Sequence, residues 1–303
     1  MRIGRGVGLA AGLGAATLAG ALAEAKAYRV VEHAVRLSEP VPAFRLRVLH
    51  LSDLHYMAGQ TDKLAFLRGL AALEPDLVIG TGDLLCDDAG LDELTAALGG
   101  LLAKPGAFVF GSNDYMAPAG GNPLRYLKRR TSRHLDLGLA NLDWQRFRDV
   151  LKGAGWADLS NARARLRAGG LSLELRGTDD AHSGLDDYAV VAGPASPGVD
   201  LSLGVTHAPY RRLLDAMCAD GVPLVLAGHT HGGQVCLPWY GALVTNCDLP
   251  RAMASGLHRY RPEGSAGGEG TWLHVSAGLG TSPYTPFRLF CRPEVCLIDL
   301  QLA

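Results

Sequence analysis

Short apolar runs alternate with segments of helical spacing along most of the chain. Residues 45–51 alternate between polar and apolar and then become continuously apolar, which is typical of a buried strand. Residues 62–73 have helical spacing, and Pro75 ends that helix because proline cannot continue it. The same pattern predicts strands at 76–80, 107–110, 171–176, 201–205, 222–227 and 272–276, and helices at 91–102, 144–153 and 210–219.

The order of these elements indicates the fold class. Strands and helices alternate in the first part of the body, which begins near Arg45, and strands cluster in the second part. This order predicts a layered α/β domain. In such domains functional side chains lie just beyond the carboxyl ends of the strands, so those positions are the place to look for chemistry.

Composition narrows the classes of protein. Hydrophobic residues make up 48% of the 303 residues and charged residues 19%, which permits a large core and excludes disorder as the main state. The net charge of −1 provides no basic field, so we expect no nucleic-acid partner. None of the six cysteines forms a C-x-x-C pair, and we interpret them mainly as core residues. The sequence does not decide whether Cys291 and Cys296 form a disulfide.

The N-terminal segment, residues 1–30, is set apart from the catalytic body at 45–303. Residues 6–23 carry no charge and follow Arg2 and Arg5. This composition predicts a membrane anchor, with a cleaved signal peptide or a disordered or soluble helix as the alternatives. We therefore expect a protein that is membrane-associated or exported. The side of the membrane and the oligomeric state are not indicated.

Five predicted strands end in side chains that can bind metals. Any one of these residues alone is typical of a turn, a helix cap or a hydrogen-bonded histidine. Together they supply carboxylate or amide oxygens and four imidazoles, a mixed set that suits Zn, Mn or Fe better than Ca or Mg. The side chains are Asp53 and His55, Asp83, Asn113 with Asp114, His207, and His229 with His231.

The order D-x-H, G-D, a third motif, a lone His and G-H-x-H resembles the calcineurin-like metallophosphoesterase superfamily. The resemblance extends over about residues 45–300. The stretches at 228–234 and 276–282 are similar to its membrane-associated bacterial branch, which includes enzymes acting on lipid or nucleotide-diphosphate compounds of the envelope. The resemblance implies a layered α-β-β-α sandwich with a single catalytic domain and a phosphoester hydrolase activity.

The resemblance also implies a dinuclear metal centre with a hydroxide between two divalent ions. A bridging carboxylate and the hydroxide are needed because two cations a few ångströms apart repel strongly. The implied roles are Asp53, His55 and His231 on the first metal, Asp83 as the bridge, and His207, His229 and an amide oxygen of the third motif on the second.

The third motif departs from the family pattern. Where the family has G-N-H-D, this chain has Gly111, Ser112, Asn113 and Asp114. Strict register places Ser112 at the ligand position and Asn113 at the catalytic histidine, whereas a shift of one residue lets Asn113 bind the second metal. We favour Asn113, because an amide oxygen is the better neutral ligand. In either case the motif lacks an imidazole proton donor.

The missing donor indicates the kind of substrate. A positioned general acid contributes roughly 10²- to 10⁴-fold when the leaving group is poor. We therefore predict hydrolysis of a pyrophosphate or activated phosphodiester in a phosphorylated small molecule or lipid. His182 is a candidate replacement donor, with an ordinary loop histidine as the alternative. We name Arg288 and Tyr115 as candidate substrate-binding residues; a surface salt bridge and simple packing are their alternatives.

The same candidate metal ligands are compatible with two other functions. One is a phosphomonoesterase or phosphoprotein phosphatase, and the other is a non-catalytic scaffold stabilised by metal. A serine hydrolase and a P-loop enzyme are disfavoured because G-x-S-x-G and G-x-x-x-x-G-K-[ST] are absent. Residues 118–142 are rich in basic side chains and form either a lid that contacts lipid headgroups or a solvated surface loop.

Overall fold

The computed structural model describes residues 2–37, 44–118, 120, 134–265 and 269–302, with side chains described from residue 12 to residue 301. Most of the predicted basic segment at 118–142, including Arg125, Lys128 and Arg133, lies outside the described residues. Residues 1–11 of the predicted anchor lie outside the described side chains. Among the helices whose side chains are described, none has both the length and the apolar character needed to cross a bilayer.

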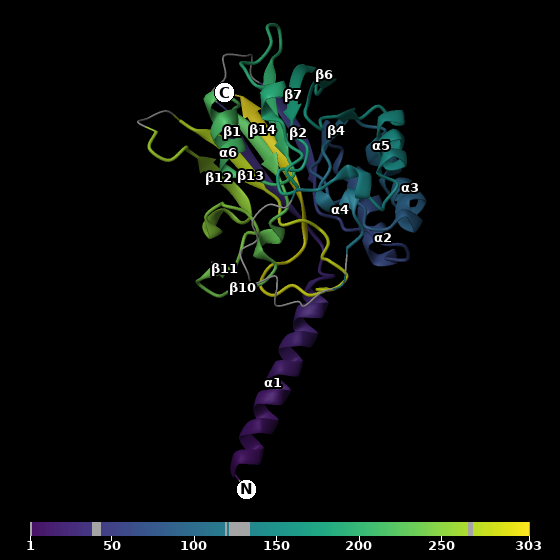
Figure 1. Cartoon of the computed structure of the whole chain (residues 1–303), viewed down its shortest axis with the longest axis vertical. Helices are drawn as coiled ribbons and strands as arrows, with labels where there is room; N and C mark the ends of the chain where they lie inside the picture. The colour runs from purple at the N-terminus through teal and green to yellow at the C-terminus, as the bar shows by residue number, and fades with distance from the viewer. Residues whose placement is uncertain (1, 38–43, 119, 121–133, 266–268, 303) are drawn as a thin grey trace.

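Two six-stranded sheets form the centre of the molecule (Figure 1). The first has the order β1-β14-β2-β3-β4-β5, and the second has the order β12-β13-β9-β8-β7-β6. The first consists of β1 (Arg29–Leu37), β14 (Glu294–Leu302), β2 (Phe44–Leu51), β3 (Leu77–Gly80), β4 (Gly106–Phe108) and β5 (Ala157–Asp158). The second consists of β12 (Gly256–Tyr260), β13 (Thr271–Val275), β9 (Leu224–Ala227), β8 (Leu201–Thr206), β7 (Leu171–Gly177) and β6 (Ala162–Ala168).

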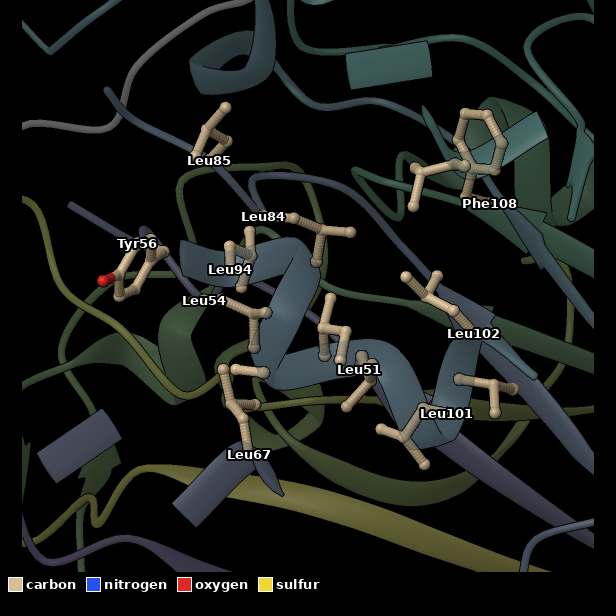
Figure 2. Close-up of a cluster of buried hydrophobic side chains, with 14 of the residues drawn as sticks. Leu51, Leu54, Tyr56, Leu67, Leu84, Leu85, Leu94, Leu101, Leu102 and Phe108 are labelled. Carbon is tan, nitrogen blue, oxygen red and sulfur yellow. The ribbon is translucent and has the colours of Figure 1, made fainter. Parts of the chain in front are cut away.

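Helices cover the outer face of each sheet. On the first sheet these are α2 (Thr61–Gly69), α3 (Leu91–Leu102) and α5 (Trp144–Gly153), and on the second it is α6 (Arg211–Ala219). Figure 2 shows part of the apolar contact between these helices and the first sheet, in which Leu51 of β2 lies among Leu67, Leu94 and Leu101. A second apolar layer fills the space between the sheets. The order helix, sheet, sheet, helix confirms the predicted α-β-β-α fold.

The predicted elements are present with ends that differ by a few residues, but the prediction is incomplete. The last turn of the predicted 62–73 helix is a separate 3₁₀ turn, Leu70–Leu73. β1 was not predicted, and it pairs in parallel with β14, so the folded body begins before residue 45. The alternation of Val31, His33, Val35 and Leu37 is the signal that marks this strand.

One helix and a small hairpin lie at one end of the molecule. The helix α1 (Arg2–Glu24) projects from this end, and the small hairpin of β10 (Cys236–Leu237) and β11 (Gly241–Ala242) lies near its base (Figure 1). The Glu24 carboxylate accepts hydrogen bonds from the backbone N–H groups of Phe290 and Cys291 at 3.0 and 2.6 Å. All six cysteines are free, so Cys291 and Cys296 do not form the disulfide that the sequence left possible.

Candidate metal centre

Parallel strand pairing aligns the loops that carry the candidate ligands. Leu51 at the end of β2 is paired with Gly80 of β3, and Gly80 is paired with Phe108 of β4. In the second sheet Thr206 of β8 is paired with Ala227 of β9. The carboxyl ends of these strands therefore lie at one edge, where the side chains that follow them meet.

The backbone at five candidate ligands is left-handed. This conformation is uncommon for residues other than glycine and concentrates at functional sites. It turns the chain sharply immediately after each strand, so that the side chain points back over the strand ends. The φ values are 48° at Asp53, 42° at His55, 51° at Asp83, 69° at His229 and 51° at His231.

The first candidate ligand group brings together Asp53, His55, Asp83 and His231. One ligand atom from each lies within 4.8 Å of the others, and all four residues are buried. The His55 Nε2 atom is 3.1 Å from His231 Nε2 and 3.4 Å from Asp83 Oδ2, and His231 Nε2 is 3.5 Å from Asp53 Oδ1. Facing imidazole nitrogens and carboxylate oxygens at these separations suit a divalent cation between them.

A second group adjoins the first through Asp83. His207 Nε2 is 3.6 Å from Asp83 Oδ2 and 3.3 Å from His229 Nδ1. The other nitrogens of both rings are engaged, because His207 Nδ1 donates to the carbonyl of Thr81 at 2.7 Å and His229 Nε2 to that of Asn246 at 3.2 Å. These bonds leave His207 Nε2 and His229 Nδ1 as the ring atoms that can bind an ion beside the shared carboxylate. The donor set thus fits two divalent ions bridged by Asp83.

Burial and mutual charge shift the pKa values of these groups. Burial raises the pKa of Asp53 to about 6. Burial also opposes ionisation of Asp83, but the His207 and His55 imidazoles and the Asn113 donors outweigh it and lower the pKa of Asp83. The two carboxylates raise the pKa of His207 to about 9 against the opposing effect of burial. Burial lowers the pKa of His55 to about 4. The centre is therefore a compact set of opposite charges withdrawn from water.

Asn113 contacts the shared carboxylate of Asp83 directly. The helix α4 (Ser112–Tyr115) follows β4, and its Asn113 donates to both oxygens of Asp83, from the backbone N–H at 2.8 Å and from Nδ2 at 2.6 Å. Rotation of the amide by half a turn presents its oxygen to an ion at the same place. Gly111 is required here because a Cβ on it would lie 2.3 Å from Asp83 Oδ1.

Asp114 has a role that the sequence did not reveal. Its carboxylate accepts hydrogen bonds from the backbone N–H groups of Asp83, Leu84, Leu85 and Gly111, at 2.6 to 3.0 Å. It therefore joins the loop after β3 to the loop after β4. A carboxylate that binds four backbone donors fixes the backbone on either side of the bridging residue.

His182 lies at the margin of the second group. Its ring centroid is 4.5 Å from that of His229, and its Nδ1 is 3.0 Å from the hydroxyl of Tyr210. The side chain is half-buried, so one side of the ring reaches solvent. This position is compatible with proton transfer at the centre.

Arg288 and Tyr115 do not have the positions predicted for substrate-binding residues. Arg288 is fully buried, and its guanidinium donates to backbone carbonyls that include those of Ala277 and Gly280, both at 2.7 Å. The Tyr115 hydroxyl donates to Asp179 at 2.8 Å within the core. Both side chains hold loops together, and the sequence could not distinguish this role because a loop arginine and a loop tyrosine suit either.

The chain belongs to the calcineurin-like phosphoesterase family, whose model matches residues 46–233. It is accordingly a metallophosphoesterase, a hydrolase that acts on phosphate esters.

Several curated relatives are similar over most of their length. The chain is 28% identical to an uncharacterized metallophosphoesterase, YkoQ of Bacillus subtilis, covering 83% of this chain and 82% of the relative. It is 27% identical to the phosphodiesterase YaeI of Escherichia coli, covering 84% and 82%. It is 26% identical to the UDP-2,3-diacylglucosamine pyrophosphatase LpxG of Chlamydia trachomatis, covering 84% and 83%.

Proposed function

We propose that this protein hydrolyses a phosphodiester or pyrophosphate bond whose leaving group departs easily. The observation that carries the proposal is the pair of ligand groups that share Asp83, with His55 Nε2 and His207 Nε2 at 3.4 and 3.6 Å from the same carboxylate oxygen. Two divalent ions held there would supply Lewis acidity toward a phosphoryl oxygen and would lower the pKa of a bound water.

Asn113 supports the choice of leaving group. The site has an amide where the family pattern has an imidazole, and an amide does not transfer a proton at neutral pH. A phosphate or phenolate leaving group needs no protonation, whereas an alkoxide does. Two relatives carry names for activities of this kind, a phosphodiesterase and a UDP-2,3-diacylglucosamine pyrophosphatase. We therefore favour a nucleotide-linked or lipid-linked substrate.

We assign to His182 the protonation of those leaving groups that do not depart as anions, such as an alkoxide. The half-exposed ring lies against His229, with its centroid 4.5 Å from that of His229 and its Nδ1 atom 3.0 Å from the Tyr210 hydroxyl. The candidate ligands are Asp53, His55, Asp83, Asn113, His207, His229 and His231, and the ions they would hold are Mn, Fe or Zn.

The direct test is hydrolysis of a series of aryl and alkyl phosphodiesters and pyrophosphates by protein loaded with Mn²⁺. We expect turnover that falls steeply as the leaving-group pKa rises and that disappears in Asp83→Asn. Equal rates on alkyl and aryl esters would contradict the leaving-group proposal. Preference for phosphomonoesters or phosphoproteins would favour the phosphatase alternative, and metal binding without turnover would favour a scaffold.

We further propose that the protein attaches to a membrane at the end of the body from which α1 projects. Leu13 and Leu18 of α1 are 70% and 54% exposed, and the nearby β10–β11 hairpin presents a fully exposed Trp239 beside Tyr240. Leucine and interfacial aromatic side chains of this kind favour a lipid surface. Co-flotation with phospholipid vesicles tests this, and we expect it to weaken in Trp239→Ser. Unchanged recovery of protein with and without vesicles would contradict attachment.

A further inference from the structure

A second cluster of metal-binding side chains lies between the two sheets. His33 is on β1, Cys296 on β14 and His274 on β13, and one ligand atom of each lies within 4.8 Å of the others. Cys296 is paired with His50 across β14 and β2, so their side chains share a face of the first sheet. That face otherwise presents aliphatic side chains such as Val48 and Ile298 to the second sheet. Three imidazoles and a thiol thus interrupt an apolar layer.

A chain of hydrogen bonds joins this cluster to the candidate metal centre. The Ser52 hydroxyl donates to Asp53 and accepts from the Thr81 hydroxyl at 2.7 Å. Thr81 Oγ1 is 2.8 Å from His50 Nε2, and His50 Nδ1 is 2.9 Å from His274 Nδ1. Every member of the chain is buried.

The direction of the donors in this chain determines the protonation of both histidines. Since Thr81 uses its hydroxyl proton on Ser52, it accepts from His50 Nε2–H. His50 is fully buried, where a charged ring is costly, so the ring is neutral and its Nδ1 accepts from His274 Nδ1–H. Burial lowers the pKa of His274. A neutral ring with its proton on Nδ1 has a bare lone pair on Nε2.

That lone pair has no polar partner within the described part of the chain. His274 Nε2 is buried and makes no hydrogen bond, and the same holds for His33 Nε2. A buried polar atom without a partner is costly, and two of them beside a thiol require an explanation. Burial raises the pKa of Cys296, so the metal-free cluster contains a thiol whose proton a metal ion would displace.

We infer that His33, His274 and Cys296 bind one thiophilic divalent ion, Zn²⁺ in the first instance, separate from the ions at Asp83. Two imidazoles and a thiolate suit Zn²⁺ and disfavour Mg²⁺, Ca²⁺ and Mn²⁺. Three protein ligands leave the fourth tetrahedral position for water. β1 is the edge strand of its sheet and His33 is partly exposed, which gives the ion a route to the cluster.

An ion on His274 Nε2 would also orient the chain of donors. It holds the proton of His274 on Nδ1, and the direction of every following hydrogen bond is then fixed as far as the Asp53 carboxylate. The second site would thus position Asp53 without touching it.

The test uses the full chain, stripped of metal and reloaded with Co²⁺. A Co²⁺ ion bound by Cys296 gives a near-ultraviolet thiolate-to-metal charge-transfer band, which a centre of carboxylates and imidazoles does not give. We expect the band in the unmodified protein and in Asp83→Asn, and its loss in Cys296→Ala. Cys86→Ala is the matched control, because Cys86 Sγ is 3.1 Å from His55 Nδ1 and is the thiol beside the candidate centre.

Zinc content provides a second measurement. We expect His33→Ala to bind one Zn²⁺ fewer than the unmodified chain. Because His33 is partly exposed, this variant keeps the inference testable even if Cys296→Ala fails to fold. Absence of the band from the unmodified protein, its persistence in Cys296→Ala, its loss in Cys86→Ala alone, or an undiminished zinc content in His33→Ala would each overturn the inference. None of these readouts depends on hydrolytic activity.

Discussion

Asn113 holds Asp83 at both carboxylate oxygens, with its backbone N–H 2.8 Å from Oδ1 and its side-chain Nδ2 2.6 Å from Oδ2. The two residues follow neighbouring strands, β3 and β4, so one residue of the altered third motif is tied directly to the shared carboxylate. Asn113 is therefore expected to affect metal binding at Asp83 as well as catalysis.

Replacement of Asn113 by alanine should therefore weaken metal binding. The variant keeps the backbone hydrogen bond to Asp83 but loses the side-chain contact and the candidate ligand oxygen. We expect the affinity of the centre for Mn²⁺ to fall roughly 10- to 100-fold, the range typical of lost supporting groups. Isothermal titration measures it. Ser112→Ala is the control; a larger loss there than in Asn113→Ala would return the ligand role to Ser112.

His182→Gln tests the proposed proton donor. Glutamine keeps a polar side chain of similar length but does not exchange protons, so kcat should fall roughly 10²-fold for alkyl esters. Aryl esters and pyrophosphates should be little affected, because their leaving groups depart as anions. His134→Gln removes an exposed histidine and serves as the control. A uniform loss across all leaving groups would mean that His182 positions His229 instead.

Metal binding should release protons below about pH 9. In the metal-free protein the pKa of His207 is about 9, since Asp83 and Asp53 outweigh the effect of burial, and the pKa of Asp53 is about 6 because of burial. Both groups must lose their protons to bind a cation. Affinity should therefore rise with pH between 6 and 9 and level off above. Titration calorimetry in buffers of different ionisation enthalpy measures the protons released, and none at pH 7 would contradict this account.

The hydrogen-bond chain behind Asp53 predicts an effect at a distance. Thr81→Val preserves shape but breaks the bonds to Ser52 and His50. We expect a loss of metal affinity at the centre of roughly tenfold, as for other groups that orient a ligand. Thr95→Val is the matched control, since the Thr95 hydroxyl donates to the Leu91 carbonyl within α3, away from the candidate centre. Equal affinities in both variants would show that the chain does not orient Asp53.

Asp114→Ala should destabilise the fold. Four buried backbone N–H groups lose their acceptor, and unmet buried donors cost about 1–3 kcal/mol each, so we expect a loss of at least about 3 kcal/mol in the free energy of unfolding. Urea denaturation of the metal-free protein measures it. Asp92→Ala removes an exposed carboxylate and should leave stability nearly unchanged. A small loss in Asp114→Ala would mean that water satisfies those donors.

The sequence predicted the layered fold and its ligand-bearing strand ends because buried parallel strands are continuously apolar and end abruptly. It did not predict β1, whose charged outer positions and half-buried His33 weaken the apolar signal. Arg288 and Tyr115 are buried, which the sequence did not predict because local sequence does not reveal which way a loop side chain turns. The second cluster escaped notice since His33, His274 and Cys296 are far apart in sequence and each sits inside a strand rather than at its end.

The left-handed backbone at the five candidate ligands has a consequence for the protein without metal. Each such residue costs of order 1–3 kcal/mol relative to a relaxed conformation, and it persists only where the surroundings enforce it. Removal of the ions leaves no group that bridges the buried carboxylates and imidazoles next to these bends, so the loops after the strands should be the first segments to exchange their amide hydrogens. Metal content would then determine how readily the protein is degraded as well as how fast it turns over substrate.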